Sequence, residues 1–189
     1  LLDGMTRVYA RLSDFSASFE QVSTDSSNRR QVQRGLLYLS RNGRKMRFDY
    51  QTPAAKSYYS DGKTYTAFDP AAGQAVQSPV SKAVDERLQV FQVLVGNREW
   101  RDQYPRAELL ADAPLNAGRR VVRLFPHRND LPLVLLEIEP QSSLIERFEL
   151  TYPDGERTEY RFSAIKTARV DPALFVFTAP SGVEVVQER

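Results

Sequence analysis

The sequence of 189 residues contains no cysteine and a single histidine. The lack of thiols excludes disulfides, thiolate metal sites and a cysteine nucleophile. With one imidazole and no thiolate, we also expect no transition-metal site. The nine glycines are scattered along the chain and form no phosphate-binding loop, so we expect no nucleotide or other cofactor.

The one histidine, His127, lies in the polar stretch Pro126-His127-Arg128-Asn129-Asp130. A catalytic triad would need this imidazole beside a serine and a carboxylate, and Asp130 is close in sequence. The composition of the stretch is typical of a solvated turn between strands. We therefore predict a loop here, and we expect the chain to be a binding protein and not an enzyme.

The sequence also lacks a strong excess of one charge and any long apolar run. Basic residues number 26 and acidic residues 24, and no stretch approaches the 18 apolar residues that a membrane span needs. We expect Leu1 to be a mature or trimmed end. The basic run from Arg41 to Arg47, with Phe48 and Tyr50 nearby, raises the possibility of nucleic-acid binding. Because both rings project from the face opposite Arg47, we expect no nucleic-acid partner.

Most of the chain has the period-two pattern of half-buried antiparallel strands. Met46, Phe48 and Tyr50 share one face, and Asn42-Gly43 before them is a hairpin signal. The same alternation places Phe148 with Leu150, and Tyr160 with Phe162. Further strands are predicted over 56–60, 63–69, 74–78, 119–125, 133–139, 174–178 and 183–187.

Two segments have a helical spacing of apolar residues. The first stripe consists of Leu1, Met5, Val8 and Leu12, and the second of Val80, Val84, Leu88, Phe91 and Val95. Pro79 would open the second helix and Gly96 would cap it. Nothing in the sequence suggests a linker, so we predict a single domain over 1–189.

The apolar face of such a sheet must be covered, and two helices can cover it only in part. Either a tightly packed core or a cavity therefore lies between them, and composition alone favours the packed core. A cavity would suit an acyl chain, since each buried methylene contributes about 0.8 kcal/mol.

Four segments, in this order along the chain, resemble the outer-membrane lipoprotein carrier family, LolA. They are Phe15–Gln21, Gly35–Pro53, the hairpin Ser60-Asp61-Gly62-Lys63 with Phe68-Asp69-Pro70, and Phe175–Val185. The chain departs from the family at Asn42, Phe48 and Thr66, where the family has a proline, a tryptophan and an aromatic residue.

The resemblance implies a mainly β fold, a half-open antiparallel β-barrel covered by a helical lid. It also implies a periplasmic carrier, expected to be monomeric, that binds acyl chains of lipoproteins in a hydrophobic cavity. The partners implied are an inner-membrane transporter and an outer-membrane acceptor. The alternatives are a carrier of another amphiphile, such as a glycolipid, and a regulatory protein that senses lipoproteins on the same scaffold.

The inward faces of the strands and helices supply the expected lipid-binding residues. They are Leu37, Leu39, Arg41, Met46, Phe48, Tyr50, Leu88, Phe91, Phe148, Leu150, Tyr160 and Phe162, and Leu12 is expected to join them. The resemblance makes Arg41 the latch that holds the lid shut. A buried guanidinium needs acceptors for its donors, and helix ends offer free carbonyls. The alternative is that Arg41 ends its strand in water at the hairpin.

Overall fold

The computed structural model describes residues 8, 9, 11–83, 85, 87, 88, 90, 94, 102–110 and 118–188. The chain groups into two compact units. Unit 1 consists of Leu1–Arg11, Glu20–Val32 and Gln92–Ser163, and unit 2 consists of Leu12–Phe19, Gln33–Phe91 and Ala164–Arg189. Three strands run from one unit into the other: β1 (Asp14–Thr24), β2 (Arg30–Ser40) and β11 (Arg157–Lys166).

Unit 2 is built on an antiparallel meander that continues from β2. Its further strands are β3 (Lys45–Thr52), β4 (Lys56–Ser60), β5 (Thr64–Asp69) and β6 (Gln74–Pro79). The predicted turns at Asn42-Gly43 and Asp61-Gly62 join β2 to β3 and β4 to β5. Both glycines have positive φ, which the turns require and which glycine adopts without strain.

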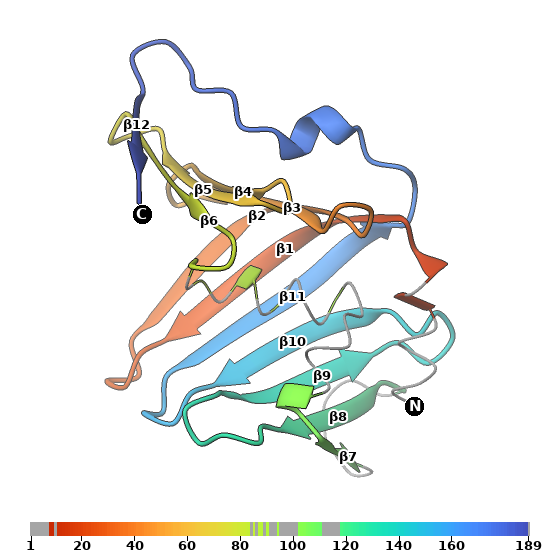
Figure 1. Ribbon diagram of the computed structural model, residues 1–189. Helices are drawn as coiled ribbons and strands as arrows, with labels where there is room; N and C mark the ends of the chain where they lie inside the picture. Colours follow the sequence, from red (N-terminus) through yellow and green to blue (C-terminus); the bar gives the residue numbers. More distant parts are fainter. Residues whose placement is uncertain are drawn as a thin grey trace. The chain divides into compact units, whose positions relative to one another are not determined.

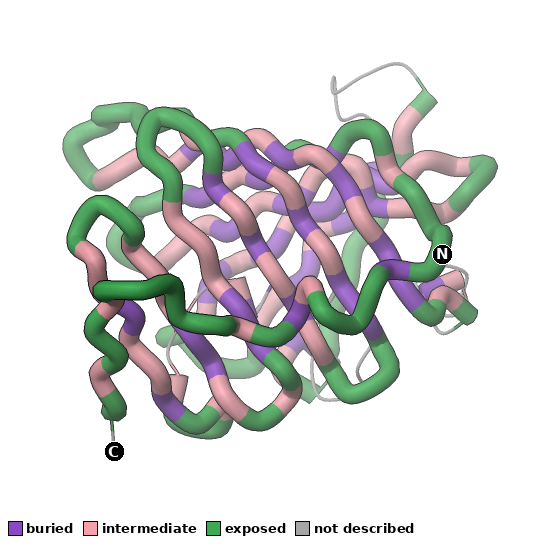
Figure 2. Tube along the Cα trace, turned by 90° about the horizontal axis from the view of Figure 1, so that it is seen from above, coloured by how far each residue is buried: buried purple, intermediate pink, exposed green. Residues whose placement is uncertain are grey.

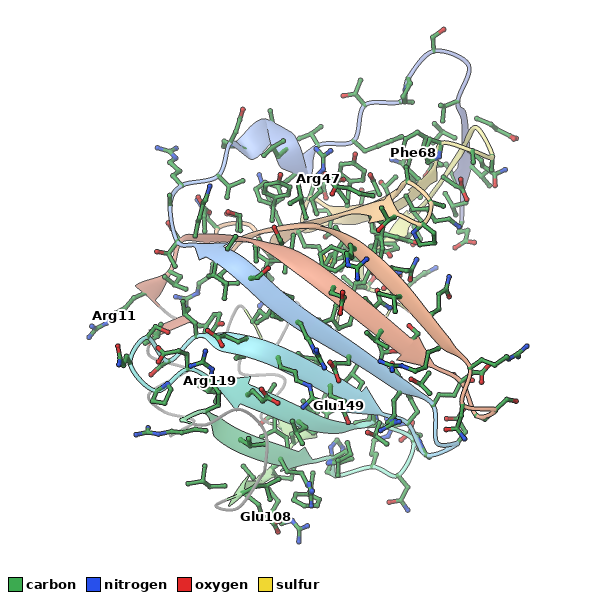
Figure 3. The ribbon with its side chains drawn as sticks, turned by 180° about the vertical axis from the view of Figure 1, so that it is seen from behind. Arg11, Arg47, Phe68, Glu108, Arg119 and Glu149 are labelled. Carbon is green, nitrogen blue, oxygen red and sulfur yellow. The ribbon has the colours of Figure 1, made fainter. Side chains whose placement is uncertain are left out.

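The C-terminal segment of unit 2 runs along the meander (Figure 1). It contains the short 3-10 helix η1 (Pro172–Phe175) and ends in β12 (Glu184–Gln187), which pairs in parallel with β6. Arg47 and Phe68 both project from the meander toward this segment (Figure 3). Arg47 Nη1 donates to the carbonyl of Leu174 at 3.1 Å, and the rings of Phe68 and Phe177 lie 5.3 Å apart. The segment therefore covers one face of β3–β5.

Unit 1 contains a second antiparallel meander. Its strands are β7 (Arg106–Leu110), β8 (Arg120–Phe125), β9 (Leu133–Ile138) and β10 (Ile145–Thr151), and β10 pairs with β11. The predicted turn at Pro153-Asp154-Gly155 joins the last pair, and it is closed by the N–H of Tyr152 donating to Glu156 O.

The structure corrects the expected half-open barrel with a helical lid. The hydrogen-bonded order is β12-β6-β5-β4-β3-β2-β1-β11-β10-β9-β8-β7, so the sheet is open, with β12 and β7 at its edges. A barrel needs a strand order that closes on itself. No α-helix is delimited among the residues that the structure describes, nor is any helix in that part long and apolar enough to cross a membrane.

The expected start of the second helix is wrong for a specific reason. Pro79 is the last residue of β6, where it pairs with Thr64. The N–H of Val80 then donates to Lys63 O at 2.8 Å, so the hairpin continues where we expected a helix to begin. A proline lacks the N–H that a ladder needs, and a strand end tolerates it as well as a helix start does.

The rest of the two helical stripes is only partly described. Val8, Arg87 and Leu88 have helical backbone, whereas Leu12 does not. Of the stripe residues, these lie outside the described part: Leu1, Met5, Val84, Phe91, Val95 and the expected cap Gly96.

Most predicted strands are confirmed, and the exceptions are instructive. β4, β5, β6, β8, β9 and β12 match their predicted ranges to within one residue at each end. The strand predicted over 174–178 is wrong, because Asp171 caps η1 by accepting from the N–H of Ala173 at 2.9 Å. β7 was not predicted, since its sequence Arg-Ala-Glu-Leu-Leu does not alternate.

Burial follows the alternation of the strands. Figure 2 shows buried and intermediate residues taking turns along them, with exposed residues at the connections. Along β3, for example, Met46, Phe48 and Tyr50 are buried while Arg47 and Asp49 between them are half-buried. One face of each meander therefore forms the core of its unit.

Candidate functional site

In unit 2, the predicted lipid-binding residues of β2 and β3 share one face. Leu37 is opposite Phe48, and Leu39 is opposite Met46. Residues directly opposite in an antiparallel pair project to the same side. These side chains and that of Tyr50 are between 0% and 3% exposed. The structure thus brings five predicted residues together in one apolar surface.

Aromatic rings extend this surface across the neighbouring strands. Phe19 meets Phe48 and Tyr50 edge-on, with centroids 5.6 and 4.9 Å apart. Tyr58 lies 5.6 Å from Tyr50 and stacks on Tyr65 at 6.5 Å. Tyr58 and Tyr65 were not among the predicted residues. The strand register could have found them, because Tyr58 is opposite Phe48.

A half-buried ion pair lies over these rings. Arg87 Nη1 and Asp85 Oδ2 are 2.9 Å apart, and both side chains are 13% exposed. The guanidinium lies 3.7 Å from the centroid of Tyr58, and its Nε donates to the hydroxyl of Tyr50 at 2.9 Å. Tyr65 donates its hydroxyl to Asp85. Burial and the neighbouring Asp85 charge raise the pKa of Tyr65, so this hydroxyl stays a donor.

The predicted helical residues are less fully placed. Leu88, next to Arg87, is buried in unit 2, and Leu12 is half-buried. Phe91 lies outside the described residues.

In unit 1, the four predicted strand residues also share a face. Phe148 is opposite both Tyr160 of β11 and Leu136 of β9. Tyr160 and Phe162 are stacked with centroids 6.3 Å apart. Leu150 continues the same face, and none of the four predicted side chains is more than 5% exposed. Unit 1 therefore has an apolar face of its own.

The opposite face of unit 1 is charged. Arg147 binds three carboxylates, Glu137 at 2.6 Å, Glu149 at 2.5 Å and Glu159 at 2.7 Å. Glu149 is on the face of β10 turned toward the viewer in Figure 3. Burial would raise the pKa of Glu159, but its bonds to Arg147 and Arg161 outweigh burial and lower it.

In the described part of the chain, no group of His, Asp and Glu side chains could hold a metal ion.

Arg41 lies just beyond β2, in the exposed turn of the hairpin. Its backbone N–H donates to Ser13 O at 2.9 Å. It does not continue the buried face of Leu37 and Leu39, as the period of the strand suggested. Its role as a latch, and the lipid-binding role of the other residues, stay predictions.

His127 lies in the loop that the sequence predicted. Its Nδ1 is 3.0 Å from Gln103 O, and the ring is exposed. Asp130 is bound by Arg128, whose Nη2 lies 2.5 Å from Oδ2. The carboxylate that could have oriented the imidazole is thus paired elsewhere, so the structure gives no catalytic dyad at these two residues.

Comparisons with known proteins agree with this fold. The family model described as outer membrane lipoprotein carrier protein LolA matches residues 10–178. The chain is 28% identical over 187 residues to an outer-membrane lipoprotein carrier protein of Haemophilus ducreyi, covering 98% of this chain and 84% of that one. It is 27% identical over 176 residues to one of Glaesserella parasuis, covering 93% of this chain and 79% of that one.

Two solved structures share the fold. A conserved protein of Thermus thermophilus has a TM-score of 0.65 at 14% identity, covering 99% of this chain and 97% of that one. A LolA superfamily protein of Nitrosomonas europaea has a TM-score of 0.50 at 12% identity, covering 93% of this chain and 96% of that one.

Proposed function

This chain belongs to the outer membrane lipoprotein carrier protein LolA family, and on that premise we propose that it binds the acyl chains of lipoproteins and carries them through the periplasm. The observation that carries the proposal is the family match over residues 10–178. The relatives it resembles are named outer-membrane lipoprotein carriers. The donor would be an inner-membrane transporter, and the acceptor would lie at the outer membrane.

The apolar faces of the two units support an acyl cargo. The predicted strand residues on these faces are uncharged, and the ion pair of Asp85 and Arg87, which follow β6, lies over the rings of unit 2. Transfer of each methylene from water to such a surface contributes about 0.8 kcal/mol. The binding energy would then grow with chain length and would need no particular headgroup. A carrier of this kind needs no catalytic group.

Arg87 bears on how cargo enters unit 2. Its guanidinium covers the rings of Tyr50 and Tyr58, so an acyl chain lying on those rings must displace it. Cation–π contacts contribute about 0.5–2 kcal/mol. Displacing the guanidinium therefore makes the free energy of binding less favourable by a small, fixed amount. The transfer of a few methylenes from water to the apolar face offsets this cost. Reversible binding follows from this balance.

The test measures affinity against chain length. A series of fluorescent fatty acids that differ by single methylenes is titrated into the purified chain. We expect each added methylene to lower Kd about fourfold, the equivalent of about 0.8 kcal/mol. An affinity that does not change with length would contradict the proposal.

A cross-linking experiment locates the bound chain. A photoreactive phenylalanine analogue is placed at Phe48 or Phe162, on the apolar faces, and an acylated lipoprotein is added. The matched control places the analogue at Phe68, which lies on the other face of unit 2 against Phe177. We expect cross-links from the first two positions and not from the third. Equal cross-linking from all three would exclude the apolar faces as the site.

A further inference from the structure

One end of unit 2 carries a group of cationic side chains, which we call the basic end. They come from the hairpin of β2 and β3, the turn after β4, the segment after β6 and the segment after β11. The basic end consists of Arg41, Arg44, Lys45, Lys63, Lys82 and Arg169. All of them are exposed except Lys45, which is half-buried.

Close backbone packing holds the first two turns together. A Cβ atom built on Gly62 would lie 1.9 Å from the carbonyl oxygen of Gly43. Only glycine allows this approach, because any side chain there would collide with backbone. The turn that carries Arg44 and the turn that carries Lys63 are therefore held side by side.

Two hydrogen bonds place Lys82, and a pocket places Arg169, next to these turns. The N–H of Val80 donates to Lys63 O, and the N–H of Lys82 donates to Pro79 O at 2.9 Å. These bonds keep the Lys82 turn next to the Lys63 turn. A pocket of about 350 Å³ lies between the β2–β3 hairpin and the C-terminal segment that contains Arg169. The residues lining it are Ser13, Asp14, Ser40, Asn42, Lys45, Arg169, Val170, Pro172 and Phe175.

The carboxylates beside the basic end are hydrogen-bonded to the backbone. Asp61 Oδ1 accepts from the N–H groups of Lys63 and Thr64, both at 2.8 Å. Asp14 is buried and accepts from the N–H of Val170 at 2.9 Å. Within the described ranges, no ion pair joins Lys63, Lys82 or Arg169 to a carboxylate. The basic end thus has more cations than the carboxylates that lie beside it, Asp14, Asp61 and Asp171, each of which accepts from a backbone N–H.

We propose that the basic end docks the protein on a membrane surface that contains anionic phospholipids. Each Lys or Arg near such a surface contributes about 1 kcal/mol, and a clustered set acts together. The pocket adds a place for a lipid phosphate, since Lys45, Arg169, Ser13 and Ser40 are among its lining residues, beside the buried Asp14 that accepts from the N–H of Val170. Docking would hold the carrier at the bilayer without inserting any segment. The proposal does not depend on which cargo is carried.

The experiment measures binding of the full chain to vesicles by flotation. One set of vesicles contains phosphatidylglycerol and phosphatidylcholine, and the other contains phosphatidylcholine alone. The test variant is Lys63→Gln with Arg169→Gln. The control variant is Arg30→Gln with Arg157→Gln, which removes the same charge from exposed arginines in unit 1.

We expect binding to the anionic vesicles alone, weakened about ten- to thirty-fold in the test variant. The control variant should bind like the wild type. Raising the salt from about 0.1 M to about 1 M should abolish binding, because the screening length falls from about 10 Å to about 3 Å. Fatty-acid affinity should be equal in all variants, which separates this test from that of the carrier function.

Three results would overturn the proposal. The first is equal binding to neutral vesicles, and the second is an equal loss in both variants. The third is an absence of vesicle binding together with weaker binding of the test variant to a purified transporter or acceptor. That result would assign the basic end to an acidic protein surface.

Discussion

At the scale of single residues, Arg147 is a side chain whose loss should lower the stability of unit 1. It is 13% exposed and binds Glu137, Glu149 and Glu159. Removing it leaves three carboxylates close together without their cation. Breaking a buried pair in this way costs about 3–5 kcal/mol, and the partial exposure here favours the lower end. We expect Arg147→Ala to lower the free energy of unfolding by about 3 kcal/mol, measured by urea denaturation.

Arg161→Ala is the matched control, because Arg161 binds the same Glu159 but is 60% exposed. An exposed pair contributes about 0–1 kcal/mol, so this variant should be nearly as stable as the wild type. The pH dependence gives a second readout. The pKa of Glu159 is lowered in the folded protein, so its stabilising effect is present above the unfolded pKa of about 4.3 and is lost as the pH falls through the folded value. If Arg147→Ala unfolds no more easily than Arg161→Ala, the network is not stabilising.

At the scale of elements, the sequence predicted the strands better than it predicted the order of the sheet and the segments that cover it. Period two is a local signal, and it correctly placed Met46, Phe48 and Tyr50 on one buried face. The open order of the sheet depends on contacts far apart in the sequence, so local patterns did not reveal it. The stripe beginning at Val80 looked helical because its spacing fits a helix, although the first of its residues completes a hairpin.

The candidate site shows the same limit. The alternation identified the strand residues but not the polar groups above them, because Asp85 and Arg87 look like an ordinary solvated helix face in sequence. Their contacts with Tyr50, Tyr58 and Tyr65 follow from a fold that brings residues from three strands together. For Arg41 the sequence pattern predicted too much. The alternation of β2 was extended one residue beyond Ser40, where the strand ends, and this placed Arg41 on the buried face although it lies in the turn.

A prediction at this scale concerns the two packed turns of unit 2. Gly62→Ala introduces a Cβ atom 1.9 Å from Gly43 O, at φ +95°. The control is Gly73→Ala, which also has positive φ, at +62°, but has no atom within 4 Å of the new Cβ. Positive φ costs about 1–2 kcal/mol in both, and the collision adds about 1–3 kcal/mol in the first. Equal midpoints in urea for the two variants would show that the turns separate at little cost.

At the scale of the whole molecule, the two compact units raise the question of whether the chain unfolds as one domain or as two. Three strands, β1, β2 and β11, contribute residues to both units. Unfolding one unit alone would therefore cut these strands part-way, at positions 19–20, 32–33 and 163–164. The unit that stayed folded would then keep three partial strands whose broken ends are exposed. That is an unfavourable intermediate, since an exposed, unpaired strand edge is costly and prone to associate.

We therefore predict one cooperative transition for residues 1–189. The measurement is amide hydrogen exchange at rising urea, with β3 reporting on unit 2 and β9 reporting on unit 1. The slowest amides of both strands should exchange with the same free energy and the same dependence on urea, because both need global unfolding. A population in which β9 exchanges while β3 stays protected, or the reverse, would show that the chain consists of two domains and that the single-domain prediction is wrong.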